Sequence, residues 1–169
     1  MGFFDKLFGG KHDAAPKFAG EKMVVKAPID GTVIPLEQIP DETFATAILG
    51  PGCGIEPTGD TVYAPFDGTI TQVASTLHAI GITSDDGIEL LIHVGMDTVE
   101  MQGKGFKALV KVGDKVKAGT PLLKVDLDAI RAAGHPTATA IIVTNGDDMG
   151  ELKMLAEGDV LAGTPLFKF

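Results

Sequence analysis

The chain has 169 residues and a formal net charge of -9, and its single cysteine is Cys53. This length fits one domain that folds on its own core, since such a chain buries roughly 68–70% of its unfolded surface. The acidic charge repels phosphate backbones, which argues against nucleic acid as a partner and favours a basic protein. The unpaired cysteine, the lack of a signal peptide and the lack of an apolar run of ~18 residues predict a cytoplasmic protein that does not span a membrane.

The beginning of the chain predicts a short amphipathic tip and linker over residues 1–22. Apolar side chains recur there at helical spacing, and a Gly-Gly pair and a polar stretch follow them. A frayed terminus is the simplest interpretation. The alternative is weak contact with a membrane surface through residues 3–8, whose apolar members are Phe3, Phe4, Leu7 and Phe8.

Residues 23–169 form the predicted globular domain, and their pattern is that of an all-β protein. Short runs rich in Val, Ile and Thr alternate with Gly, Pro and Asp, while sustained helical periodicity is nearly absent. This predicts an antiparallel β-sandwich or barrel. Brief helical turns are expected over residues 38–43, 104–110 and 127–133.

Two sequence motifs occur twice within this domain. Ala-Pro-Ile-Asp-Gly-Thr-Val-Ile at residues 27–34 returns at residues 64–71 as Ala-Pro-Phe-Asp-Gly-Thr-Ile-Thr. Gly-Asp-Lys-Val-Lys-Ala-Gly-Thr-Pro-Leu at residues 113–122 returns, one residue shorter, at residues 158–166. Each copy holds a glycine-containing turn between β-rich flanks. The repetition predicts duplicated hairpin units whose two halves pack face to face.

Two of the four histidines lie within predicted strands. Near the first, alternation along residues 87–95 puts Glu89, Leu91 and His93 on the face opposite to a row of apolar side chains. The polar face of this strand therefore carries His93.

The second histidine lies just upstream. Along residues 76–82, alternation predicts that Thr76 and His78 share one face of a strand, and a Ser-Asp-Asp-Gly turn at residues 84–87 leads into the strand of His93. The resulting hairpin is predicted to bring both imidazole rings together.

A histidine pair has few chemical uses: shared metal ligation, acid–base work, or nucleophilic catalysis in which the second ring stabilises charge. A single histidine in a strand is usually structural, but two on one hairpin favour chemistry. His12 and His135 have no such partner and are interpreted as surface residues.

The run at residues 87–106 resembles the phosphorylation-site signature of glucose-type IIA proteins, the EIIA type-1 family of the bacterial phosphoenolpyruvate-dependent sugar phosphotransferase system. The resemblance covers nearly everything after residue 22, and it implies the duplicated hybrid motif architecture and no cofactor. Its further motifs lie at residues 27–31, 40–44, 52–59, 64–68 and 77–81.

The resemblance also implies roles for individual residues. His93 would accept a phosphoryl group from the phosphocarrier HPr as a tele-phosphohistidine, His78 would stabilise that group, and Thr76 would orient His78. The group would then pass to a cysteine on the IIB domain of a glucose-type permease, which couples sugar uptake to sugar phosphorylation. A neutral imidazole with a pKa of about 6.5 has the lone pair that such transfer needs.

The family also implies an apolar rim that docks partners and excludes water. The matching positions are Phe44, Ile48, Leu91 and Val99, with Thr43 close by. The alternative is that these apolar residues belong to the core. Asp147 matches an active-site aspartate of the family, although an Asp-Asp pair in a glycine-containing turn is also typical of a solvated turn.

Other functions remain open at this point. The chain could act mainly as a regulatory binding protein whose phosphorylation state other proteins read. A zinc metallopeptidase of the lysostaphin-like fold is a remote alternative, because His93-Val94-Gly95 lacks the His-x-His spacing, although His78 and His93 could share zinc with a partner's carboxylate. A biotinyl or lipoyl carrier is disfavoured, because no lysine occupies the hairpin tip that such domains modify.

Overall fold

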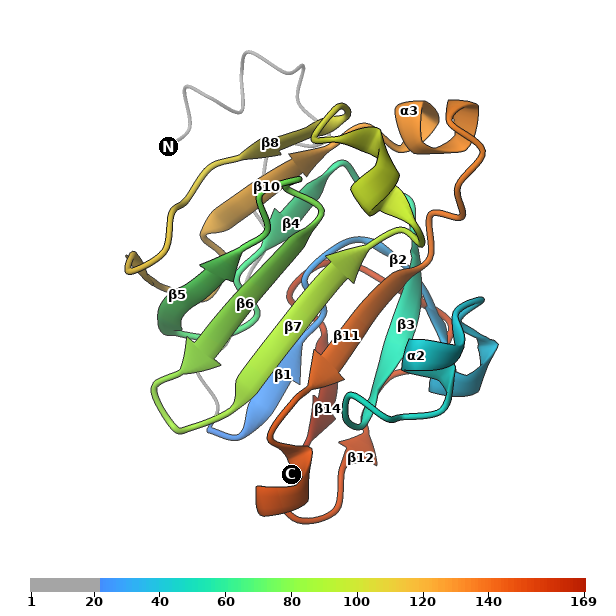
Figure 1. Ribbon diagram of the computed structural model, residues 1–169. Coiled ribbons are helices and arrows are strands. Elements are labelled where there is room, and N and C mark those ends of the chain that lie inside the picture. Colours follow the sequence, from blue (N-terminus) through green and yellow to red (C-terminus); the bar gives the residue numbers. More distant parts are fainter. Residues whose placement is uncertain (1–21) are drawn as a thin grey trace.

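The computed structural model describes residues 22–169, and it is built almost entirely from antiparallel strands (Figure 1). The strands are β1 Val24–Lys26, β2 Gly31–Ile34, β3 Gly52–Pro57, β4 Thr61–Tyr63, β5 Gly68–Val73, β6 Ala79–Ser84, β7 Glu89–Val94, β8 Phe106–Ala108, β9 Lys115–Val116, β10 Pro121–Val125, β11 Thr139–Val143, β12 Lys153–Met154, β13 Asp159–Val160 and β14 Pro165–Lys168. The helices are α2 Glu42–Ala45 and α3 Leu127–Ala132, with 3-10 turns η1 Leu36–Gln38, η2 Thr98–Met101 and η3 Gly146–Asp148.

The strands form one large sheet and two small ones. The large sheet has eight strands in the order β13-β2-β3-β11-β7-β6-β5-β9, and the small sheets have the orders β1-β14-β12 and β4-β10-β8. One apolar core contains side chains from all three sheets, among them Val25, Ile92 and Leu122, each fully buried. The predicted all-β antiparallel fold is confirmed, and because the sheets are open, the fold is a sandwich and not a closed barrel.

The duplication expected from the repeated motifs is confirmed by repeated hydrogen bonds. In one half the carboxylate of Asp30 accepts from Ala162 N at 2.7 Å, and in the other half Asp67 accepts from Ala118 N at 2.8 Å. These bonds join the first motif to the second in each half. The two strands that begin within the first motif and its copy, β2 and β5, are bordered by β13 and β9 at opposite edges of the large sheet.

Strand β7 places the alternating side chains as the sequence predicts. Leu90, Ile92 and Val94 point into the core with exposed fractions of 3%, 0% and 0%, while His93 faces the other side and is partly exposed. Burying each of these apolar side chains stabilises the fold by roughly 1.5–3 kcal/mol. The core thereby fixes which face His93 occupies.

The predicted helical turns have mixed outcomes. The turn at residues 127–133 is confirmed as α3, whose first turn is capped by the Asp126 carboxylate accepting from Ala129 N at 3.0 Å. The turn at residues 38–43 falls on the end of η1 and on the start of α2.

The third predicted turn, at residues 104–110, is wrong. Residues 106–108 form strand β8, which pairs with β10, and the helical turn η2 lies earlier in the chain. Gly103 and Gly105 have φ values of +89° and +87°, which end any helix before Phe106. From there Phe106 is buried and Lys107 exposed, which is the alternation of a strand.

The predicted amphipathic tip at residues 3–8 lies outside the described residues. Within residues 22–169, none of the helices has the length and apolar character needed to cross a membrane.

Candidate active site

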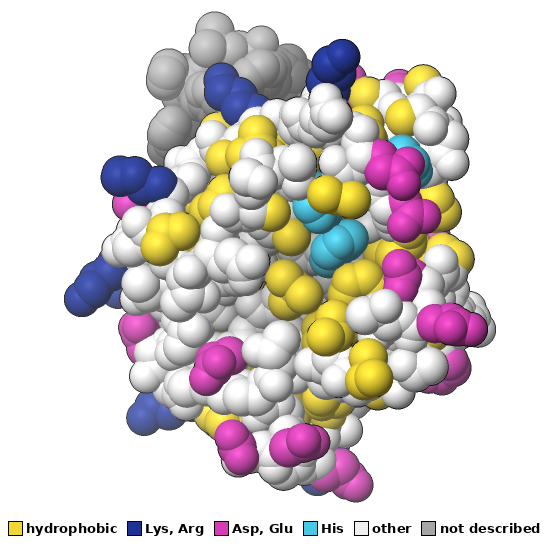
Figure 2. Space-filling model, viewed as in Figure 1, with side chains coloured by type: hydrophobic (Ala, Val, Ile, Leu, Met, Phe, Trp, Pro, Cys, Tyr) yellow, Lys and Arg dark blue, Asp and Glu magenta, His cyan; other side chains and the backbone are white. Residues whose placement is uncertain are grey.

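The hairpin of β6 and β7 brings His78 and His93 together. Ala79 pairs with His93 across the hairpin, and Val94 N donates to His78 O at 2.8 Å. The centroids of the two imidazole rings lie 4.7 Å apart, with an angle of 79° between the ring planes. Figure 2 shows histidine atoms visible at one face of the molecule, with hydrophobic side chains gathered around them. The predicted pairing of the rings is confirmed.

His78 and Thr76 are close, but not through a shared strand face as the sequence predicts. Strand β6 begins only at Ala79, and the preceding residues form a turn in which Leu77 N donates to Ala74 O at 2.8 Å. Leu77 has φ +65°, a left-handed conformation that costs a non-glycine residue roughly 1–2 kcal/mol. The turn places Thr76 Oγ1 2.9 Å from His78 Nδ1.

The hydrogen bond of His93 determines which of its nitrogens is available for chemistry. Its Nδ1 lies 2.9 Å from the carbonyl oxygen of Gly95. A carbonyl oxygen only accepts hydrogen bonds, so Nδ1 carries the proton and donates it. In the neutral ring the lone pair is therefore on Nε2.

Burial keeps both imidazoles neutral. Loss of water, and to a lesser degree the neighbouring His78, lower the pKa of His93 to about 4, although the Gly95 bond and the Asp41 charge oppose this shift. Burial also lowers the pKa of His78, and a hydrogen bond from the ring to the Thr76 backbone opposes this shift. At neutral pH the site therefore offers an uncharged nucleophilic nitrogen next to a second uncharged ring.

The four predicted rim residues differ in exposure. Phe44 is 5% exposed and belongs to a small apolar cluster beneath α2, yet its ring centroid lies 4.9 Å from that of His93. Leu91 is half-buried against the same cluster, whereas Ile48 and Val99 are 77% and 52% exposed. The core interpretation therefore fits Phe44, and Ile48 and Val99 are open to solvent.

The structure does not bring Asp147 to the histidines. Strand β11 runs antiparallel to β7, with Ala140 opposite His93 and Val143 opposite Leu90, so η3 begins beyond the far end of β7. Three residues of strand already span about 10 Å. Asp147 is exposed there, as a solvated turn residue would be.

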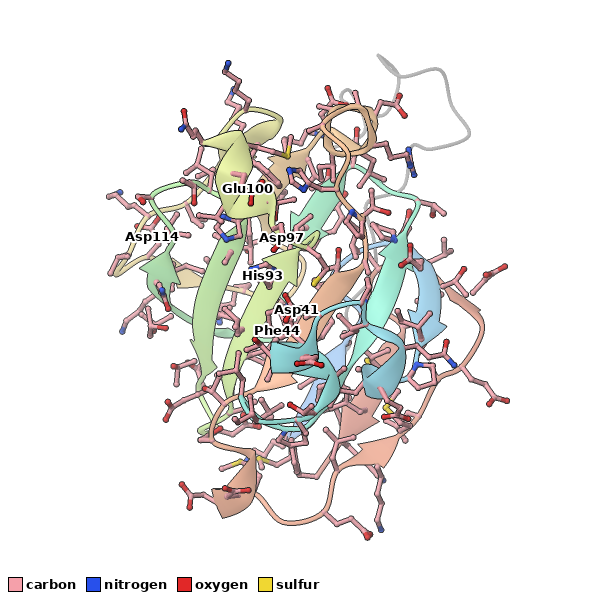
Figure 3. The ribbon with its side chains drawn as sticks, turned by 45° about the vertical axis from the view of Figure 1, so that its right-hand side comes forward. Asp41, Phe44, His93, Asp97, Glu100 and Asp114 are labelled. Carbon is pink, nitrogen blue, oxygen red and sulfur yellow. The ribbon has the colours of Figure 1, made fainter. Side chains whose placement is uncertain are left out.

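Sequence reasoning missed the acidic side chains around the pair. Figure 3 shows Asp41 and Asp97 on either side of His93, with Glu100 farther along η2. Asp41 caps α2 by accepting from Thr43 N at 2.8 Å, and its signals in the sequence were this capping pattern and its place in the motif at residues 40–44. The closeness of Asp41 to His93 depends on contacts between distant parts of the chain, whereas Asp97 follows His93 closely in the sequence.

His135 is also misplaced by the sequence-based interpretation, which expected it at the surface. Its side chain is 13% exposed, and its Nε2 lies 3.9 Å from the Glu100 carboxylate. It therefore packs between η2 and the segment before β11.

A metal-dependent site finds little support. Among residues 22–169, no group of three or more His, Cys, Asp or Glu side chains is arranged to hold an ion. His78 and His93 supply two nitrogen ligands, and a tetrahedral zinc site would need two more from elsewhere.

The fold and the site define an all-β protein equipped for nucleophilic chemistry at one neutral imidazole. The sequence model of the phosphoenolpyruvate-dependent sugar phosphotransferase system, EIIA 1, matches residues 23–149. The chain belongs to this family, which confirms the resemblance found in its sequence.

Individual relatives agree with this assignment. The glucose-specific EIIA component of Halalkalibacterium halodurans is 41% identical over 164 residues, which cover 95% of this chain and 93% of that protein. The N-acetylglucosamine-specific EIICBA component of Klebsiella pneumoniae is 43% identical over 143 residues, which cover 84% of this chain and 22% of that protein. Glucose permease IIA from Mycoplasma capricolum has a similar structure, with a TM-score of 0.79, 34% identity, and coverage of 89% of this chain and 97% of that one. The chain spans about a fifth of the length of several relatives it matches.

Proposed function

We propose that this chain is a phosphocarrier of the sugar phosphotransferase system and that His93 carries the phosphoryl group. In the first step the Nε2 lone pair of His93 attacks phosphorus on phospho-HPr. The new nitrogen–phosphorus bond forms as the donor's bond to phosphorus breaks. In the second step a cysteine thiolate of a IIB domain attacks the same phosphorus, and the electron pair returns to Nε2. Both steps take place in the cytoplasm.

The single observation that carries this proposal is the bond from His93 Nδ1 to Gly95 O. It leaves the lone pair on Nε2, and the lowered pKa of His93 keeps that nitrogen free of a proton at neutral pH. A nucleophile that needs no base to activate it suits a protein that must accept and release a group repeatedly.

We assign His78 the role of stabilising the phosphoryl oxygens. If the Thr76 hydroxyl donates to His78 Nδ1, the proton of His78 lies on Nε2, where it can donate to one of those oxygens. Phosphoryl transfer depends mainly on positioning and on stabilising charge spread over the equatorial oxygens. Thr76 is thus proposed to set the direction of the His78 donor.

The surface around the histidines fits basic proteins. Ile48 and Val99 offer exposed apolar contacts, and Asp41 and Asp97 add negative charge on both sides of His93. Figure 2 shows lysine and arginine side chains mainly along the left and upper edges of this face, away from the histidines. Such complementarity raises the rate of encounter with a basic partner. We propose HPr and a IIB domain of a glucose-type permease as the two partners.

A regulatory role uses the same surface. Phosphorylation of His93 would add negative charge beside the exposed apolar contacts and so change which proteins bind there. We therefore treat a regulatory binding function as an addition to the relay, with other target proteins as its partners.

Transfer from phospho-HPr tests the proposal directly. We expect one phosphoryl group per chain, bound in an acid-labile and base-stable form, and no labelling of His93→Ala. His135→Ala is the matched control, since it removes a histidine that does not face the pair, and it should be labelled normally. Labelling that survives His93→Ala would overturn the proposal.

A further inference from the structure

The Gly95 carbonyl sets the proton position on His93, so whatever holds this carbonyl matters to the site. Gly95 has φ +75°, in the left-handed region that favours glycine. A Cβ on this residue would lie 2.5 Å from Thr98 Cγ2 and 3.0 Å from Pro136 O. The Thr98 methyl group therefore lies directly beside the space that a Gly95 side chain would occupy.

Hydrogen bonds hold the backbone on both sides of Gly95. On one side the Thr98 hydroxyl donates to Val94 O at 2.6 Å. On the other side Met96 N donates to Pro136 O at 3.0 Å. With both neighbouring residues held, rotation of the Gly95 carbonyl away from His93 is opposed from two directions.

Of these two hydrogen bonds, only the one from Thr98 is made by a side chain. Thr98 is 0% exposed, so water has no access to replace its hydroxyl. The same Val94 residue donates its N–H to His78 O at 2.8 Å, which links this bond to the second histidine as well. The Thr98 hydroxyl bonds to Val94 O and not to either imidazole.

We propose that Thr98 is a positioning residue for the phosphoryl acceptance proposed above for His93. Its buried hydroxyl fixes Val94 and so holds the Gly95 carbonyl against His93 Nδ1, while its methyl group only fills the space beside Gly95. The lone pair consequently stays on Nε2, where the phosphoryl group arrives. The inference rests on the proposed function, but its first test does not.

Two variants separate the parts of the Thr98 side chain. Thr98→Val keeps its shape and removes the hydroxyl, and Thr98→Ser keeps the hydroxyl and removes the methyl group. Imidazole nitrogen NMR shifts of the unphosphorylated full chain, with no donor present, report where the His93 proton lies. We expect Nδ1–H in wild type and in Thr98→Ser, and a mixture of the two tautomers in Thr98→Val.

Phosphoryl uptake from phospho-HPr gives a second readout. We expect Thr98→Val to be about tenfold slower, at the low end of the effect of residues that orient an active group through another. Thr98→Ser should restore the wild-type rate. If wild type itself takes up no phosphoryl group, the phosphocarrier proposal fails, and the tautomer measurement still decides the role of Thr98.

Thr61→Val is the matched control. Thr61, in strand β4, is also buried, with 7% of its surface exposed. Its hydroxyl donates to the Asp60 carboxylate at 2.9 Å and accepts from Lys124 Nζ at 3.0 Å. Its loss should lower stability and leave the His93 tautomer unchanged. A wild-type tautomer in Thr98→Val overturns the inference. If Thr98→Val does not fold, mixed tautomers in Thr98→Ser overturn it, because the hydroxyl is still present there.

Discussion

The two halves of the duplicated fold share one scaffold, yet only one half carries the paired histidines. Strand register shows which positions correspond. Gly31 of the first motif pairs with Pro57, and its counterpart Gly68 pairs with Ser84, so β3 and β6 are equivalent strands. Gly52 is the first residue of β3 and Ala79 is the first residue of β6, and each lies five residues before the paired position, so these two residues are equivalent.

The equivalence extends to the histidines themselves. Gly52 pairs with Ile142, and Ala79 pairs with His93, so Ile142 occupies in one half the place of His93 in the other. At the strand ends, Val143 N donates to Pro51 O at 2.9 Å, as Val94 N donates to His78 O at 2.8 Å. Pro51 therefore stands where His78 stands.

The connections between the strands break this symmetry. Residues 35–51 include α2, whose Phe44 packs with Ile142 in one apolar cluster and also reaches the His93 ring. The equivalent connection, residues 74–78, is a short turn that presents His78. The duplicated strands therefore provide the same backbone framework in both halves, and the differing connections provide the side chains that surround His93.

The largest effect is expected from copying a histidine into the other half. Ile142→His places an imidazole in a position that is 0% exposed, where it loses apolar contacts and leaves polar nitrogens unpaired. We expect the free energy of unfolding to fall by about 5 kcal/mol in urea denaturation. The reverse change, His93→Ile, should alter it by less than about 1 kcal/mol. Equal losses in the two variants would contradict the asymmetry of the halves.

Phe44→Ala tests whether α2 serves both halves. Removing this buried ring should lower the free energy of unfolding by about 4 kcal/mol. It should also raise the pKa of His93 from about 4 towards its usual value, because water then reaches the ring. Phe66→Ala is the control, since Phe66 is 6% exposed in the main core. A pKa of His93 that stays unchanged in Phe44→Ala would separate α2 from the site.

His78→Gln tests the contribution of the short connection. The variant should still accept a phosphoryl group, but onward transfer to a IIB domain should be about 100-fold slower, because the glutamine N–H is not held where the imidazole N–H lies, an effect of the size seen when a donor to a charged transition state is lost. Rapid-quench kinetics of the second step measure this. His135→Gln provides the comparison and should transfer normally. Unimpaired onward transfer in His78→Gln would show that the second ring is dispensable.

The last expected effect concerns pH, and within any single pH unit it is the smallest. The pKa of His93 is about 4 in the folded chain, against about 6.5 in the unfolded chain, so the unfolded chain binds this proton first as pH falls. As pH falls from about 6.5 to about 4, His93 should therefore lower the free energy of unfolding by up to about 1.4 kcal/mol for each pH unit. His93→Gln lacks this group, and its stability should fall less steeply there. Parallel curves for the two proteins would argue against the lowered pKa.

Much of the fold is predictable from the sequence because its signals are local or repeated. Alternating apolar residues place His93 on the outer face of β7, and the repeated motifs reveal the duplication. The hairpin turn then suffices to pair the two imidazoles. These features depend on neighbouring residues or on copies of the same residues.

The unpredicted features depend on contacts between distant parts of the chain. Phe106 joins a strand because β10 pairs with it, and Leu77 adopts a left-handed conformation with no glycine to signal it. Asp41 approaches His93 only because α2 folds over the central strands. Asp147 matches the family motif in sequence but follows β11 to the end away from the pair.

The Gly95 carbonyl bears on release as much as on acceptance. Because Nδ1 keeps its proton and donates it to this oxygen, a phosphoryl group that leaves Nε2 would leave behind a neutral imidazole. Neutral imidazole is a good leaving group, whereas the imidazolate anion is a poor one. In the phosphocarrier role proposed for His93, one backbone oxygen would thereby favour both acceptance and release of the phosphoryl group.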